Sequence, residues 1–307
     1  AVGLTNGIRA NKVEAVGGWL GRLPRLVQEL PDAQFGQASM NQLGGALLYV
    51  WPLTLAVAIA PAPQRGSRWP VTPGLRWLAA GAAMVLGAAL LLAQSRGAWV
   101  GALAGLLCLA ALRWPWGRWA ALAVVMLGGL AWLFGGRASW GPLVAEALFG
   151  ARGPQTAWGQ VSLSGRLEIW ARAIGYIRAS PWLGGGWGTF RLWDAALSSR
   201  AARSIFDAGT PHAHNIFLQV AYDAGLPGLA AYLALLIVQI RLSWRVYRHG
   251  RGALRALALG ALAASVAHHI YGLTDAVALG SKPSVLWWAV LALSASLHRL
   301  SFTHRSR

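Results

Sequence analysis

Seven blocks of apolar residues, each close to the length of a lipid bilayer, dominate this chain of 307 residues. A helix needs about 17–25 consecutive apolar residues to cross a bilayer, and its backbone amides are then satisfied within the segment. The blocks are rich in Ala, Leu and Gly and lack the alternation of a membrane β-strand. The sequence therefore predicts an all-α, polytopic integral membrane bundle of about seven spans. The predicted spans are 43–60, 75–93, 97–112, 118–134, 214–242, 252–273 and 283–297.

Composition supports one membrane domain rather than several soluble ones. Hydrophobic residues make up 56% of the chain and charged residues only 12%, whereas soluble proteins have about 25% charged residues. We expect a single domain over 1–307. Its parts are an extracytoplasmic segment (1–42), four spans (43–134), a large, partly helical extracytoplasmic loop (135–213), and three spans with a short cytoplasmic tail (214–307). The start lacks Met and a signal-peptide pattern, so we expect it to follow earlier helices.

The net charge of +18 would suit a nucleic-acid partner, but its distribution argues against one. The arginines gather in four connections that share one side if every span crosses once, and Arg-rich short loops mark the cytoplasmic side. We therefore predict a multi-pass protein of the cytoplasmic membrane, with the bilayer as a partner and no nucleic acid. These arginines are Arg65, Arg68, Arg76, Arg113, Arg118, Arg241, Arg245, Arg248, Arg251, Arg255, Arg299, Arg305 and Arg307.

The large loop contains a predicted amphipathic helix over 164–178, capped by Ser164 and ended by Pro181. Arg166 lies one turn before Trp170, and it either has a function or extends to lipid headgroups while the apolar face rests on the membrane. The glycine run 184–188 follows; without a preceding strand, it favours a tight turn or hinge over a dinucleotide site. The apolar face comprises Ile169, Trp170, Ala173, Ile174 and Ile177.

Arg96 stands between two spans with almost no loop, on the side where the charge bias does not favour arginine. Ionisable groups at that depth are costly, so Arg96 is a candidate functional residue. Extension of its side chain to water is the alternative.

His212, His214 and Asn215 open the predicted helix that enters the membrane and breaks near Gly225. A helix N-terminus carries about half a positive charge. This disfavours imidazolium and suits a histidine base, and the same amides favour a phosphate. The pattern is a poor zinc site because no third ligand is evident, and plain capping is the alternative.

Three further polar residues lie towards the C-terminus. We interpret His268 and His269 as packing or polar helix contacts. Asp275 is an acid near the extracytoplasmic end of its span, where it could pair with an arginine.

Four stretches, taken in order, resemble motifs of the O-antigen ligase and polymerase superfamily. They are Ser95-Arg96-Gly97 after a span, Arg166-x-x-x-Trp170 in the loop, His214-Asn215-x-x-Leu218 followed by six further residues and then Gly225, and a weaker segment over 35–41. The resemblance covers roughly residues 35–295. Several N-terminal spans of the family pattern are missing, which agrees with the expected preceding helices.

The resemblance implies transfer of a glycan from an undecaprenyl-pyrophosphate carrier to a hydroxyl-bearing acceptor: lipid A–core, a growing polysaccharide, or protein. It implies an inverting enzyme that needs no metal or other cofactor and has a periplasmic active site. His214 would be the base, Arg96 and Arg166 would bind pyrophosphate, and His212 and Asn215 would support them. The alternatives are a transporter of a small anion such as bicarbonate, for which an internal repeat is missing, and an inactive membrane fragment.

Overall fold

The computed structural model describes residues 40–61, 69–93, 95–134, 163–190, 192 and 212–302. Within these residues the protein is helical and contains no strand, which confirms the all-α class. The elements are α4 (Met40–Ala58), α5 (Pro73–Leu92), α6 (Arg96–Arg113), α7 (Pro115–Phe134), α9 (Leu163–Ala179), α11 (Ile216–His249), α12 (Gly252–Tyr271), the 3-10 helix η4 (Lys282–Ser284) and α13 (Val285–Phe302).

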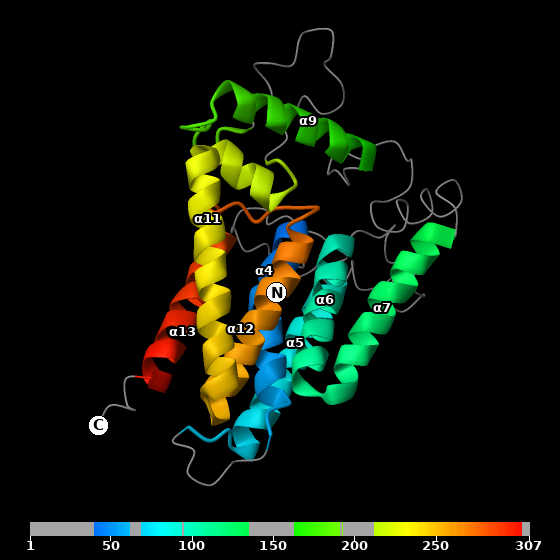
Figure 1. The fold of residues 1–307 in the computed structure, drawn as a ribbon, viewed down its shortest axis with the longest axis vertical. Coiled ribbons are helices and arrows are strands. Elements are labelled where there is room, and N and C mark those ends of the chain that lie inside the picture. The colour runs from blue at the N-terminus through cyan, green and yellow to red at the C-terminus, as the bar shows by residue number, and fades with distance from the viewer. Residues whose placement is uncertain are drawn as a thin grey trace, which may run out of the picture.

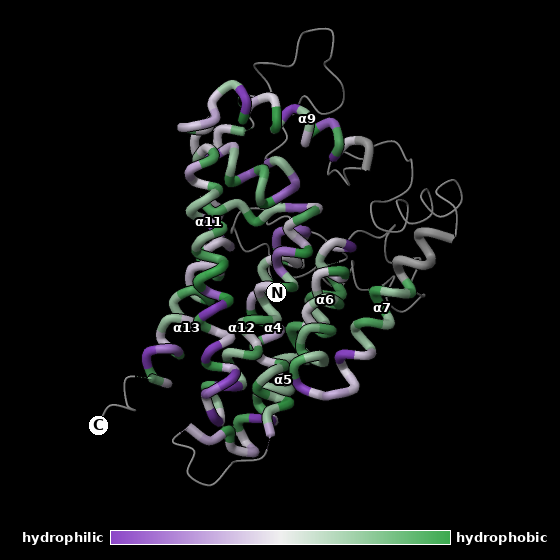
Figure 2. Tube along the Cα trace, in the orientation of Figure 1, coloured by the Kyte–Doolittle hydropathy of each residue, from purple (hydrophilic) through white to green (hydrophobic). Residues whose placement is uncertain are grey.

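Every predicted span coincides with a helix, but the number of membrane crossings is confirmed only in part. Five helical segments of the described chain are long and apolar enough to cross a membrane: α5, α6, α11, α12 and η4 with α13. Helices α4 and α7 occupy the first and fourth predicted spans and are not among these five. Seven crossings therefore remain a prediction. Figure 2 shows hydrophobic residues along the helices and hydrophilic residues towards their ends.

Successive helices run in alternating directions, so that their ends gather at two ends of the bundle (Figure 1). At the upper end in that view lie the start of α6, the start of α11 and the end of α12, with α9 lying across them. We call this the α9 end. The opposite end, here called the arginine end, carries Arg113, Arg118 and the arginines of 241–255.

Helix α12 occupies the centre of the bundle. In its most apolar window 61% of the residues are buried, against 17–28% in the other candidate spans. Small residues allow this, because helices in membranes approach closely where side chains are short. A Cβ atom placed on Gly101 of α6 would overlap the carbonyl oxygen of Ala267 in α12.

A buried polar network joins the three C-terminal helices. Gln239 of α11 donates to Ser243 and Ser294 at 3.1 Å each, and its carbonyl oxygen accepts from Ser265 of α12 at 2.6 Å. Ser294 belongs to α13, and its hydroxyl accepts from Ser243 at 2.9 Å. Polar groups removed from water are costly unless bonded, so this network fixes how α11, α12 and α13 pack.

The predicted break in the long helix is confirmed. Helical backbone geometry continues through α11 except at Gly225, where φ is 71° and ψ is −177°. Glycine adopts this left-handed region without the steric cost that other residues meet. The short segment before Gly225 therefore turns away from the long segment that follows it, and Figure 1 shows this bend at the α9 end.

The contact between α6 and α12 gives a stability prediction. We expect Gly101→Leu to lower the melting temperature in detergent, because overpacking a tight contact costs about 1–3 kcal/mol. Gly81→Leu is the matched control, since a Cβ on Gly81 of α5 has open space within 4 Å. Equal melting temperatures for the two variants would contradict this packing.

Candidate functional site

Three segments far apart in sequence meet at the α9 end. They are Arg166 in the first turn of α9, residues 212–215 before α11, and Asp275 in the turn after α12. Arg166, His212, His214 and Asp275 are all buried, with exposed fractions between 2% and 9%. The structure thus brings together two candidates from different motifs, Arg166 and His214, with an acid from a third segment.

His214 has an unusual backbone conformation. Its φ is 47°, the one positive value at a non-glycine residue among those described. Histidine is one of the residue types that adopt this region more often than most. The His214 N–H donates to Nδ1 of His212 at 3.2 Å, and the His214 carbonyl oxygen accepts from the indole N–H of Trp170 at 3.3 Å. Hydrogen bonds therefore hold both backbone groups of His214, and the fixed backbone limits where its ring can lie.

The imidazole of His214 contacts a carboxylate. Its Nδ1 lies 3.2 Å from Oδ1 of Asp275. A carboxylate only accepts hydrogen bonds, so Nδ1 carries a proton, and in the neutral form of the ring Nε2 would have the lone pair. An aspartate that fixes the tautomer of a histidine in this way is the arrangement by which proteins prepare a histidine base.

His212 is held neutral. Its Nδ1 accepts from the His214 N–H, so the proton of the neutral ring is on Nε2, which faces Asp275 Oδ1 at 3.8 Å. Burial lowers the pKa of His212 to about 3; His214 and Arg166 act in the same direction, and Asp275 opposes them. His212 is therefore a neutral residue that accepts a hydrogen bond from the His214 backbone.

Asp275 is ionised at neutral pH. Burial alone would raise its pKa, but His214, which also donates a hydrogen bond, His212 and Arg166 together bring the pKa below the usual value. Burial lowers the pKa of Arg166, while Asp275 and Tyr271 act against this. Arg166 therefore interacts with Asp275 through its charge, while the carboxylate is hydrogen-bonded to His214 and to the Ala276 N–H.

Asn215 is the N-cap of α11. Its side-chain oxygen accepts from the N–H groups of Phe217 and Leu218, and its amide donates to the Leu273 carbonyl oxygen at 3.1 Å. Because Leu273 lies in the turn that carries Asp275, Asn215 connects the histidine segment to the acid. Its role is support of the backbone, as capping by Asn predicts.

Helix α9 packs on protein at most of its apolar face, although Ile174 is 40% exposed. Ile169, Ala173 and Tyr176 are buried with Phe190 and Tyr222, and the Tyr222 ring lies 4.9 Å from that of Phe190. The alternative in which this face rests on the membrane and Arg166 reaches headgroups is wrong, because Arg166 is only 9% exposed. Helical periodicity identifies an apolar face but not what covers it.

The glycine run forms a tight turn against the break in α11. The N–H groups of Gly185 and Gly186 donate to the carbonyl oxygens of Tyr222 and Asp223 at 2.6 and 3.2 Å. A Cβ atom on Gly184, where φ is 71°, would overlap the Tyr222 carbonyl oxygen. Glycine is required here by close approach of two backbones, which agrees with the turn interpretation rather than a dinucleotide site.

Arg96 begins α6 at the same end of the bundle. Ser95 caps the helix through a 3.4 Å bond from the Ala98 N–H. A Cβ on Gly97 would lie 3.0 Å from Oγ1 of Thr274, so this helix start adjoins the turn that carries Asp275. Direct cooperation of Arg96 with Arg166 remains a prediction.

Sequence reasoning missed a third ligand-type residue beside the two histidines. His212, His214 and Asp275 have donor atoms within 4.8 Å of one another. The donor set nevertheless fits a metal poorly. Two ligands of one zinc ion lie at most roughly 4.2 Å apart, the His212 proton is on the nitrogen facing Asp275, and Arg166 adds positive charge. The absence of a metal requirement remains a prediction.

Two supporting residues were also missed. Gln219 accepts from the Ala213 N–H at 2.7 Å and donates to Asp223 at 2.8 Å, so it anchors the residue between the two histidines. A signal was present, because Gln219 and Asp223 are spaced i, i+4 on a helix that enters a membrane. Trp170 was assigned to the apolar face, whereas its indole N–H binds the site backbone.

Comparison with known proteins gives a match that covers three of the candidate site residues. Residues 81–233 match the family model described as O-antigen ligase. The chain carries an O-antigen ligase domain. No curated protein matches it. The O-antigen ligase match runs from α5 into α11 and includes Arg96, Arg166 and His214. The family is one of membrane glycosyltransferases, and with the apolar helices it indicates a multi-pass protein of the bacterial inner membrane.

The depressed pKa of His212 gives a pH prediction. An unfolded histidine protonates near pH 6.5, whereas folded His212 does so near pH 3. The unfolded state therefore binds more protons in this window, and this contribution to stability falls as the pH is lowered from about 6.5 towards 3. We expect His212→Gln to reduce the loss of melting temperature over this range. An equal loss of melting temperature over this pH range in the variant and in the original protein would contradict the lowered pKa of His212.

Proposed function

We propose that this O-antigen ligase family protein transfers a glycan from an undecaprenyl-pyrophosphate carrier to a hydroxyl-bearing acceptor on the periplasmic side of the membrane. The observation that carries the proposal is the buried His214–Asp275 pair beside Arg166. It combines a histidine base with a cation suited to a phosphate leaving group. The acceptor is lipid A–core, a growing polysaccharide or a protein.

The acceptor oxygen attacks the anomeric carbon of the donor sugar in this reaction. His214 takes the hydroxyl proton at Nε2, while Asp275 stabilises the resulting imidazolium. The bond between the anomeric carbon and the pyrophosphate oxygen breaks, and the electron pair leaves with the pyrophosphate. One displacement inverts the anomeric centre.

Charge develops on the pyrophosphate as that bond breaks, and arginine is suited to it. The guanidinium fork matches phosphate oxygens and stays charged. Arg166 is already held beside the base by burial and by Asp275. Arg96 adds a second cation at the start of α6. Stabilisation of the leaving group by preorganised cations needs no metal ion.

The first test follows carrier release from an undecaprenyl-pyrophosphate-linked oligosaccharide by chromatography, with and without EDTA. We expect transfer to survive EDTA and His214→Asn to lower its rate by about 10²–10⁴-fold, the usual contribution of a general base. Asparagine tolerates the positive φ of residue 214, so this change removes the imidazole with little strain. His249→Asn, at the far end of α11, is the matched control.

Arginine variants complete this experiment. Arg166→Ala and Arg96→Ala should also lower the rate, whereas Arg178→Ala should not, because Arg178 is exposed at the other end of α9. Full activity in His214→Asn, Arg166→Ala and Arg96→Ala would refute the proposal. No turnover with several donors, together with saturable anion flux in liposomes, would favour a transporter of a small anion such as bicarbonate.

Asp275 acts through His214 and is a positioning residue. We expect Asp275→Asn to lower kcat by at least about 100-fold while KM stays nearly unchanged, since an amide neither fixes the histidine tautomer nor stabilises imidazolium. A structural role alone would instead lower the melting temperature and the amount of active protein. An unchanged kcat in a normally folded variant would exclude the proposed pair.

A further inference from the structure

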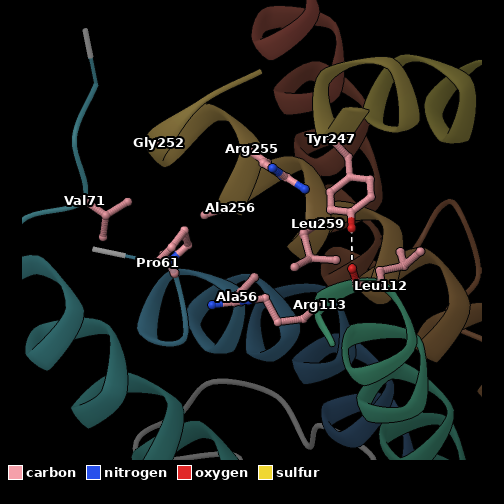
Figure 3. A pocket seen from close by; sticks show the side chains of 11 residues that line it. Ala56, Pro61, Val71, Leu112, Arg113, Tyr247, Gly252, Arg255, Ala256 and Leu259 are labelled. Atoms are coloured by element: carbon pink, nitrogen blue, oxygen red, sulfur yellow. Dashed lines mark hydrogen bonds between the residues drawn. The ribbon is translucent and has the colours of Figure 1, made fainter. Parts of the chain in front are cut away.

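A cavity lies at the arginine end, at the opposite end of the helices from the candidate functional site. A cavity of about 250 Å³ opens there between the helices, and Figure 3 shows the residues that line it. Its walls are mostly apolar, from residues such as Ala56, Val71 and Leu259, but Arg113 of α6 and Arg255 of α12 also line it. Pockets for small molecules usually begin at about 300 Å³, so this one suits a single charged head group.

The two arginines are oriented by the protein and keep donors to spare. Nε of Arg113 donates to the Ile59 carbonyl oxygen at 3.3 Å. The guanidinium of Arg255 lies 5.0 Å from the ring centroid of Tyr247, whose hydroxyl donates to the Leu112 carbonyl oxygen (Figure 3). An arginine has five N–H donors. Among the described residues these contacts leave most of the donors of both side chains for a ligand.

The described segments that meet at this end supply no acidic side chain to these arginines. The segments 59–61, 69–72, 113–118, 241–255 and 298–302 contain eight arginines and no Asp or Glu. Arg113 is half-buried and Arg255 is exposed, and two cations that line one cavity with mostly apolar walls repel each other, so an anion between them is favourable. This favours a neutralising group that comes from outside these segments.

The start of α12 adds to the positive field. Gly252 lines the cavity and is the first residue of α12. Arg251, the N-cap residue, makes no side-chain cap hydrogen bond, and the first turn contains no acid. A helix N-terminus is partially positive, which makes an arginine in its first turn unfavourable without an anion nearby.

We propose that Arg113 and Arg255 form a phosphate-binding site, distinct from the glycan-transfer site and independent of it. The ligand chemistry is a phosphate group at the membrane surface. Its source is either the head group of an anionic phospholipid, with acyl chains outside the cavity, or a soluble phosphate. Guanidinium forks match phosphate oxygens, and the apolar walls suit the glycerol carbons of a lipid.

The test is native mass spectrometry of the detergent-purified protein with phosphatidic acid and with diacylglycerol of the same acyl chains, which differ only in the phosphate. We expect preferential retention of phosphatidic acid. The double variant Arg113→Gln/Arg255→Gln should bind it at least tenfold more weakly, because each charge-assisted hydrogen bond is worth about a factor of ten. Arg248→Gln is the matched control, an arginine at the same end that does not line the cavity.

Ala256→Phe tests the cavity separately, since it fills the space while both arginines remain. Melting curves establish that each variant is folded. Equal retention of the two lipids, or unchanged binding of phosphatidic acid in both the double and the Ala256→Phe variants, would overturn the proposal. Inorganic phosphate that displaces phosphatidic acid from the original protein would identify a soluble phosphate as a ligand. Failure to displace it would identify the lipid.

Discussion

The arrangement at the α9 end depends on one buried negative charge, that of Asp275. A buried carboxylate is costly unless paired and hydrogen-bonded, and here His214, the Ala276 N–H and the nearby Arg166 supply what it needs. Asp275 in turn supplies a negative charge to Arg166 and the two histidines, which are also buried. Since Asp275 follows the central helix α12, the most firmly packed part of the bundle fixes the point on which α9 and the start of α11 converge.

Close backbone contacts then hold the glycine-rich turn and the histidine segment in one geometry. The glycine turn after α9 bonds to the carbonyl oxygens just before the α11 break, and the Leu226 N–H donates back to Pro181. Trp170 binds the His214 carbonyl oxygen from the same helix that carries Arg166. The unfavourable φ of His214 therefore persists because contacts on both sides fix it, as strained backbone persists only where the surrounding structure determines it.

Sequence patterns predicted what depends on local composition. Apolar blocks gave the helices, Gly225 gave the break, and Asn215 and the glycine run behaved as cap and turn. The sequence did not predict the pairing of His214 with Asp275, because the two residues are 61 positions apart and an arginine was the expected partner of Asp275. The alternative in which lipid covers the apolar face of α9 was wrong for a related reason. Periodicity locates an apolar face, whereas tertiary packing decides whether lipid or protein lies against it.

Helix α12 connects the two proposed sites, and its charges oppose its own dipole at both ends. A helix favours acids near its N-terminus and cations near its C-terminus, yet Arg255 lies in the first turn and Asp275 lies just beyond the last. At the Asp275 end, the chain supplies the missing charge through Arg166 and the histidines. At the Arg255 end, the adjoining segments supply only more arginines. The same electrostatic requirement is thus met internally at one end and is left for a bound anion at the other. A phosphate ligand there would stabilise the same helix that positions Asp275.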